Sequence, residues 1–149
     1  MARIQIDLPD KFSFITHIPI RITDINYGGH TGNDAFLSLL HEARMQFLNK
    51  HGYTELSFAG VGLIMKDVAI EFKGELFYGD TVSISIAATD FGKAGFDIYY
   101  KMGKEENGQA KAIGFAKTGM VCYDYQLKKI AAIPEEARIS LQSAVGSGQ

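Results

Sequence analysis

A polar, glycine-rich segment between residues 21 and 34 holds the side chains that are best suited to do chemistry. It combines a histidine with aspartates and asparagines, and a strongly helical stretch follows it. A loop ahead of a helix N-terminus offers free backbone N–H groups and the positive end of the helix dipole. Such groups, together with side chains that move protons, can polarise a carbonyl and direct water at it. The segment is therefore the candidate site, although physical chemistry alone does not name the reaction.

The stretch after this segment predicts one long helix, from about residue 33 to residue 50. Thr31 and Asp34 form a candidate capping box at its start, and His51-Gly52 closes its end. Apolar residues at helical spacing cover well over a third of the circumference, which predicts a helix largely enclosed by a sheet. The expected buried residues are Phe36, Leu37, Leu39, Leu40, Ala43, Phe47 and Leu48.

Alternating apolar residues predict strands on both sides of this helix. The first covers residues 14–22, with Ile22 on the apolar side and Pro19 favouring an edge or a bulge. Further strands are expected at 67–73, 82–86, 96–102 and 109–123, with Asn107-Gly108 as a hairpin turn and a short helix at 135–142. The pattern indicates an α+β fold, in which the long helix lies on the concave side of a curled antiparallel sheet of about five strands. We expect a single domain over residues 1–143 and a flexible tail over 144–149.

The composition argues against several classes of protein. The 149 residues include 15 Lys and Arg against 17 Asp and Glu, so no basic excess is available for nucleic-acid binding. The single cysteine, Cys122, excludes a disulfide framework and a multi-cysteine zinc site, and we expect it to be buried and not a nucleophile. No apolar run is long enough to cross a bilayer, and the start lacks a signal peptide's apolar stretch. We therefore expect a cytoplasmic protein without a membrane span.

Two stretches of the chain resemble a known family, and the resemblance covers roughly residues 14–125. The first stretch is Arg21-x-x-Asp24-x-Asn26-x-x-Gly29-His30-x-x-Asn33, followed by Phe36-Leu37 and Glu42-Ala43-Arg44. It resembles the signature of hotdog-fold acyl-CoA and acyl-ACP thioesterases, the 4-hydroxybenzoyl-CoA thioesterase-like group. Residues 77–82, FYGDTV, resemble the turn before the third strand of that family. The resemblance implies a hotdog fold, with the active sites at the interface of a homodimer or of a dimer of dimers.

Asn26 departs from the family's frequent pattern, which has an aspartate at this position as nucleophile or base. Asparagine cannot take a proton, although its amide can orient water or donate to the thioester oxygen. The base role then moves to His30 first, because an imidazole titrates near neutral pH without help. Glu42 is second, because some hotdog enzymes carry an acidic catalytic residue on the helix. Asp24 is third, as a base or as the group that orients His30.

Each candidate also has a purely structural interpretation. Asp24 can pair with Arg21 or Arg44, since a charge among apolar residues is usually paired. Asn26 can hold a left-handed turn conformation, and Glu42 can be a solvated carboxylate. His30 can be an ordinary hydrogen-bonded loop residue.

The resemblance implies hydrolysis of an acyl thioester to a free acid and a thiol. CoA or the phosphopantetheine of an acyl carrier protein is then part of the substrate, and no cofactor and no metal is needed. A non-catalytic acyl-CoA or acyl-carrier binding module, motivated by Asn26, and a hotdog-fold hydratase or dehydratase remain as alternatives. The residues expected to contact the substrate are Tyr27, Gly28, Gly29, Thr31, Asn33 and Phe36.

Overall fold

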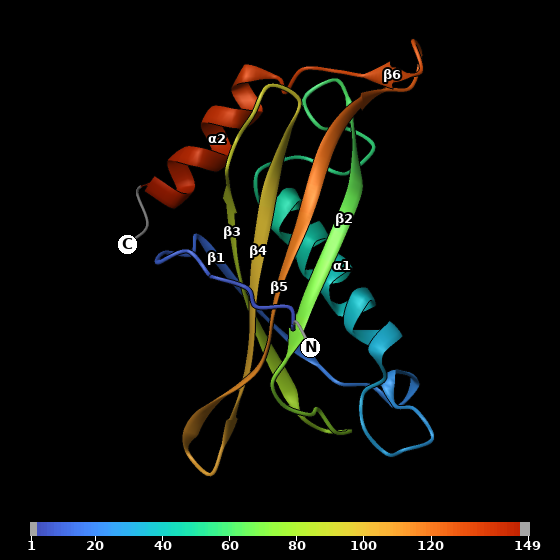
Figure 1. Ribbon diagram of the computed structural model, residues 1–149, viewed down its shortest axis with the longest axis vertical. Helices are drawn as coiled ribbons and strands as arrows, with labels where there is room; N and C mark the ends of the chain where they lie inside the picture. Colours follow the sequence, from blue (N-terminus) through green and yellow to red (C-terminus); the bar gives the residue numbers. More distant parts are fainter. Residues whose placement is uncertain (1–2, 147–149) are drawn as a thin grey trace.

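The computed structural model describes residues 3–146, which form one antiparallel sheet and two α-helices (Figure 1). The helices are α1 (Asn33–Lys50) and α2 (Glu135–Gly146), and a 3-10 turn covers Ile22–Asp24. The strands are β1 (Phe14–Pro19), β2 (Gly62–Phe72), β3 (Thr81–Thr89), β4 (Gly95–Glu106), β5 (Gln109–Asp124) and β6 (Lys129–Ile130). The order is β1-β3-β4-β5-β2, with the short β6 added beside β5. The sheet curls around α1, so the predicted α+β arrangement is confirmed.

Helix α1 begins and ends where its sequence pattern predicts. His51 closes it, and Gly52 follows with a φ of +83°, a conformation that suits glycine. The prediction is wrong for Leu37, which is 43% exposed because it faces a cavity beside Met65 of β2. The residues of α1 that are buried as predicted are Phe36, Leu39, Leu40, Ala43, Phe47 and Leu48.

The start of α1 differs from the predicted capping box. Gly32 is the N-cap residue, and no side chain caps the helix. Thr31 precedes the N-cap and is buried, and its Oγ1 has no hydrogen-bond partner within residues 3–146. The first backbone N–H groups of α1 are therefore left without a side-chain acceptor.

The two edges of the sheet are β1 and β2. Strand β1 ends at Pro19, on an edge as predicted, because the chain then enters the 3-10 turn. The predicted place of Ile22 on the apolar face of this strand is wrong, since Ile22 lies in that turn and is 66% exposed. The β4–β5 hairpin is confirmed, with φ values of 55° at Asn107 and 78° at Gly108.

Helix α2 follows Pro134 and packs beside β3 and the C-terminal end of α1 (Figure 1). Its Ala137 and Leu141 are fully buried, and His51 Nδ1 lies 3.0 Å from Ser140 Oγ. The helix continues to Gly146, beyond the predicted end at 142, and it includes residues 144–146 of the expected tail. Residues 147–149 of that tail lie outside the part of the chain described.

Candidate active site

The loop between the 3-10 turn and α1 is closed by its own backbone. Asn26 N donates to His30 O at 3.0 Å, and Gly29 N donates to Asn26 O at 3.1 Å. Gly29 has a φ of +86°, so a residue with a Cβ would be strained there. These bonds bring the two ends of the loop together and place Asn26 opposite His30.

The side chains of Asn26 and His30 both lie close to Gly28. Asn26 Oδ1 accepts a hydrogen bond from Gly28 N at 2.9 Å. A Cβ on Gly28 would lie 3.2 Å from Asn26 Oδ1 and 3.5 Å from His30 Nε2. The missing side chain therefore lets both functional groups lie on the same side of the loop, and the Asn26 amide keeps its N–H donors for a ligand.

The neighbours of His30 indicate which ring nitrogen carries the proton. Nδ1 lies 3.3 Å from Thr31 O, and a carbonyl oxygen can only accept, which assigns the proton of the neutral ring to Nδ1. Nε2 then keeps its lone pair, as a general base requires. The carboxylate of Glu75, from the loop between β2 and β3, lies 3.9 Å from Nε2.

Asp24 and Glu42 do not contact His30. Asp24 is buried, and its carboxylate accepts from Arg21 N at 2.8 Å and lies 3.3 Å from Arg21 Nη2, so it closes the 3-10 turn. Glu42 lies on the exposed face of α1 and accepts from Gln46 Nε2 at 2.8 Å. The structural interpretation of Asp24 as the partner of Arg21 is therefore the one that the contacts support.

The open N-terminus of α1 is the second part of the site. Within residues 3–146, the backbone N–H groups of Asn33 and Asp34 make no hydrogen bond, since the first bonds of the helix come from Ala35 N and Phe36 N to Gly32 O. These two donors and the helix dipole can stabilise a negative oxygen. They lie at the end of the same loop that carries the histidine.

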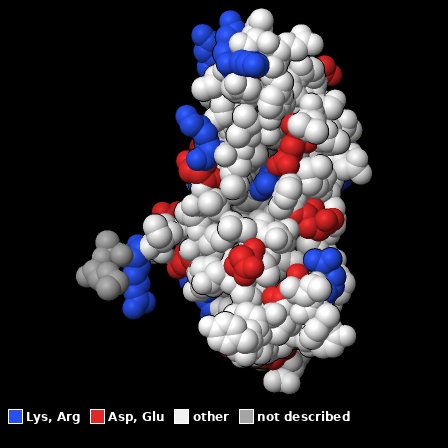
Figure 2. Space-filling model, turned by 90° about the vertical axis from the view of Figure 1, so that its right-hand side faces the viewer, with Lys and Arg blue, Asp and Glu red and all other residues white. Residues whose placement is uncertain are grey.

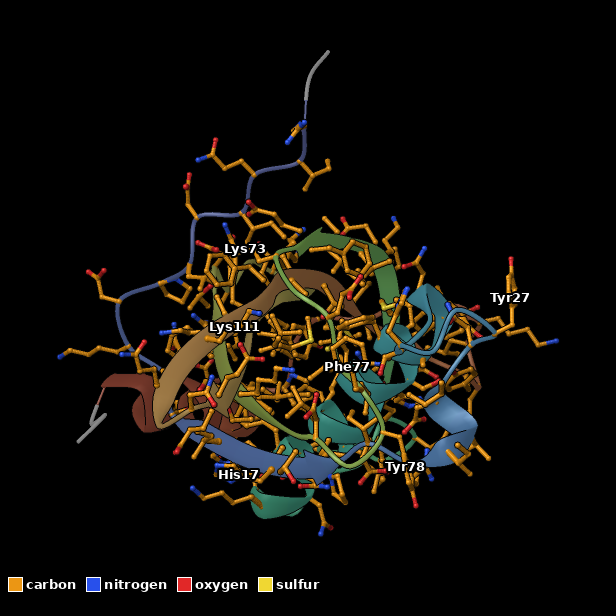
Figure 3. All side chains as sticks on the ribbon, turned by 90° about the horizontal axis from the view of Figure 1, so that it is seen from below. His17, Tyr27, Lys73, Phe77, Tyr78 and Lys111 are labelled. Atoms are coloured by element: carbon orange, nitrogen blue, oxygen red, sulfur yellow. The ribbon has the colours of Figure 1, made fainter. Side chains whose placement is uncertain are left out.

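The predicted substrate contacts differ in how they are placed. Tyr27 is fully exposed and projects away from the body of the protein (Figure 3). Phe77 and Tyr78, which lie on the loop between β2 and β3, occupy the same end of the molecule. Phe36 is instead buried and packs edge-to-face on Phe72 of β2, with 5.1 Å between ring centroids. Phe36 is therefore part of the core and offers no open surface to a substrate.

A cavity of about 220 Å³ lies beside α1, near the free edge of the sheet. Apolar and polar side chains line it, and the buried Arg44 is one of them. Its lining residues are Leu37, Ser38, Leu40, His41, Arg44, Met65 and Thr118.

Arg44 forms a hydrogen-bonded network that the sequence did not predict. Its Nε donates to Glu55 Oε2 at 2.8 Å, and its Nη1 donates to Tyr100 Oη at 3.0 Å. Tyr100 Oη lies 2.8 Å from Thr118 Oγ1, and His41 Nε2 lies 2.9 Å from Glu55 Oε1. Burial alone would raise the pKa of Glu55, but the hydrogen bonds and charge of Arg44, with help from His41, bring that pKa below its usual value.

Several other features bear on the chemistry. Cys122 is fully buried, and burial raises the pKa of its thiol to about 11, so it stays protonated at neutral pH. Within residues 3–146, no group of three metal-ligating side chains is present. In the same part of the chain, the helices are all too short or too polar to span a membrane.

Two features of the candidate site were not predicted from the sequence: the position of Glu75 beside His30, and the hydrogen-bonded network of Arg44 at the cavity. Glu75 lies two positions before Phe77, the first residue of the FYGDTV stretch. The resemblance of that stretch to the thioesterase family was the sequence signal that could have drawn attention to this loop.

Solved structures of similar fold include proteins described as thioesterases. A 1,4-dihydroxy-2-naphthoyl-CoA thioesterase from Synechocystis is 20% identical, with a TM-score of 0.76, over 87% of this chain and 95% of that one. A thioesterase superfamily protein from Jannaschia is 19% identical, with a TM-score of 0.81, over 93% of this chain and 86% of that one. An aspartate-to-asparagine mutant of 4-hydroxybenzoyl-CoA thioesterase, complexed with 4-hydroxybenzoyl-CoA, is 15% identical, with a TM-score of 0.77, over 86% and 97% of the two chains. At these identities the similarity shows the fold, and the predicted hotdog fold is confirmed.

Two sequence comparisons were informative in different ways. No curated protein sequence matches the chain at a significant level. The profile of the thioesterase-like superfamily matches residues 20–141, a range that contains the loop, α1 and the loop that carries Glu75. The chain therefore belongs to the thioesterase-like superfamily.

Proposed function

We propose that the protein hydrolyses acyl thioesters of CoA or of an acyl carrier protein. The observation that carries the proposal is that the Asn26 and His30 side chains both lie beside Gly28, in the loop that leads to an α1 N-terminus that no side chain caps. Membership of the thioesterase-like superfamily supports the same reaction class.

In the proposed reaction, the thioester carbonyl oxygen lies at the N-terminus of α1. The N–H groups of Asn33 and Asp34 stabilise the oxyanion that forms when water attacks the carbonyl carbon. His30 Nε2 takes a proton from that water, and the Asn26 amide orients the water or the carbonyl. The carbon–sulfur bond then breaks, the proton passes from His30 to the thiolate, and the free acid and the thiol leave. No cofactor takes part in this scheme.

The cavity along α1 is the proposed place of the acyl group. It begins beside Leu37, one helical turn beyond Asn33, so an acyl chain anchored at the helix N-terminus can enter it. Three thioesterases of similar fold are named for hydroxylated aromatic acyl groups, namely 1,4-dihydroxy-2-naphthoyl, gentisyl and 4-hydroxybenzoyl. An acyl group of that size, with the CoA or carrier arm outside, is compatible with a cavity of about 220 Å³.

A second copy of the chain is the proposed partner at the β2 edge. Strand β2 is a free edge, and Met65, Val68 and Phe72 on it are exposed, as is Leu37 on α1. Figure 2 views this side of the molecule, where uncharged surface extends between scattered charged groups. Pairing of two β2 edges would satisfy their backbone groups and cover the apolar side chains. Light scattering after gel filtration tests for the homodimer, or for a dimer of dimers, and a monomer at micromolar concentration would contradict it.

A thiol-release assay tests the enzymatic proposal directly. Purified protein is mixed with short-chain, long-chain and aromatic acyl-CoAs, and the rate is compared with that of heat-inactivated protein. We expect release from at least one class, and a loss of kcat in His30→Ala that is much larger than in Glu42→Ala. Absence of release across the panel would reject hydrolysis of acyl-CoA thioesters.

The second candidate function is a non-catalytic acyl-thioester binding module. Asn26 motivates it, because this position cannot supply a carboxylate. Saturable binding of acyl-CoA in calorimetry, with no thiol released over the same period, would favour binding over hydrolysis.

A further inference from the structure

Glu75 reaches the site from a loop that is far along the chain from the other site residues. The backbone on both sides of it is fixed. Gly74 N donates to a β5 carbonyl at 3.0 Å, and the carbonyl of the fully buried Leu76 accepts from Thr31 N at 2.8 Å. This last bond ties the two loops together, so the backbone itself holds Glu75 beside His30.

The position of Glu75 matters because His30 gains a positive charge when it takes up a proton. Nδ1 of the ring faces a carbonyl oxygen, and Nε2 faces Glu75 Oε1 at 3.9 Å. When Nε2 takes a proton, the imidazole becomes positively charged, and a carboxylate at this distance stabilises that charge.

We infer that Glu75 is a positioning residue for His30 in thioester hydrolysis, an inference that rests on the proposed function. As water attacks the carbonyl carbon, its proton moves to His30 Nε2, and the ionised Glu75 stabilises the resulting imidazolium. As the carbon–sulfur bond breaks, the same proton moves to the departing sulfur, and His30 returns to the neutral form. Glu75 thus supplies the negative charge that Asn26 does not.

The other carboxylates around the loop are engaged elsewhere. Asp24 accepts hydrogen bonds from Arg21, and Glu42 lies on the exposed face of α1. Asp34 lies over the N-cap, where its Oδ1 is 2.8 Å from the position that a Cβ on Gly32 would take. Of the residues that the structure describes, Glu75 is the carboxylate within ion-pair distance of His30.

Steady-state kinetics of four proteins test this inference: the wild type, Glu75→Gln, His30→Ala and the double variant. The assay is thiol release from an acyl-CoA that the wild type cleaves. Glu75→Gln keeps the size of the side chain and removes its charge. Because the side chains of His30 and Glu75 are 38% and 59% exposed, we expect kcat to fall about two- to fivefold while KM changes less than about twofold. Because Glu75 acts through His30, the double variant should be no slower than His30→Ala alone. Glu75→Asp should recover part of the lost kcat.

Glu135→Gln on α2 is the matched control, because Glu135 is also an exposed carboxylate in an ion pair, 3.0 Å from Arg138. The kcat of this variant should equal that of the wild type. A wild-type kcat in Glu75→Gln, or a double variant at least about twofold slower than His30→Ala, overturns the inference about Glu75 alone. A wild-type protein that releases no thiol overturns the proposed hydrolysis and this inference together, so the two failures are distinguishable.

Discussion

Replacement of Arg44 by methionine tests whether the buried network stabilises the helix that carries the site. Arg44 is only 5% exposed, and its guanidinium donates to Glu55 at 2.8 Å and to Tyr100 at 3.0 Å. Methionine retains a long apolar side chain and removes both donors. The change therefore isolates the ion pair and its hydrogen bonds from the packing of the side chain.

The surroundings of Arg44 determine how much stability the Arg44→Met substitution is expected to lose. Loss of two hydrogen bonds from a charged donor costs about 1.5–3 kcal/mol each. Tyr100 keeps a partner in Thr118, and Glu55 is 23% exposed and keeps His41, which reduces the penalty of leaving both acceptors behind. We expect the free energy of unfolding to fall by about 2–4 kcal/mol, near the lower part of the range for breaking a buried pair.

Urea unfolding followed by circular dichroism, at pH 7 and at one protein concentration, measures this loss. The matched control is Arg138→Met, which breaks an arginine–glutamate pair whose side chains are 39% and 64% exposed. That variant should lie within about 0.5 kcal/mol of the wild type, because exposed pairs contribute little. A loss below about 1 kcal/mol in Arg44→Met would refute the reasoning.

The difference in unfolding free energy between the wild type and Arg44→Met should depend on pH in one direction. In the folded protein the pKa of Glu55 is below its ordinary value of 4.5, since the Arg44 bonds outweigh the effect of burial. A carboxylate with a lowered folded-state pKa adds stability that is present above its unfolded pKa and is lost as pH falls through the folded pKa. In Arg44→Met the burial of Glu55 raises its pKa with no arginine to oppose it, so the gap in stability between the two proteins should be constant near neutral pH and narrow as pH falls through the acidic range in which Glu55 takes up a proton. An equal gap at acidic pH would show that packing, not charge, causes it.

Three further outcomes are expected. Leu37→Trp narrows the cavity along α1, so kcat/KM for long acyl-CoAs should fall at least about tenfold relative to short ones in a thiol-release assay. Asn26→Asp keeps the acceptor for Gly28 N but loses the amide donor, so kcat should fall about tenfold, whereas a rise would show that this position acts as a base. Cys122 should react with Ellman's reagent at pH 8 only after unfolding, and rapid labelling of the native protein would contradict its burial.

The helix and the strands could be predicted because their residues report burial at a fixed local period. The same argument failed for Leu37. Arg44 is paired, as expected for a charge among apolar residues, but its partner is Glu55 and not Asp24. Both residues fall on the apolar side of the helical wheel, but which of them is buried depends on where the sheet ends. Arg44 finds Glu55 and Tyr100 on other elements, whereas Leu37 faces the free β2 edge. That topology is not encoded in the sequence of the helix itself.

In the candidate site, too, the local contacts could be predicted from the sequence and the distant ones could not. Asn26 and His30 were predicted because one short loop contains both of them. Glu75 was not, because its place depends on the bond from Thr31 N to Leu76 O, a contact between distant segments without a periodic signal. The capping box was wrong for a local reason, since Gly32 takes the N-cap position and Thr31 turns into the core.

The position of Glu75 also bears on the choice between hydrolysis and simple binding. A neutral thioester gains little from a carboxylate near the helix N-terminus, and an oxyanion formed there would be repelled by it. The charge becomes useful once a proton has moved to His30, because the Glu75 carboxylate then lies 3.9 Å from an imidazolium nitrogen. A binding module has no such charged intermediate, so the His30–Glu75 pair favours hydrolysis even though Asn26 taken alone favours binding.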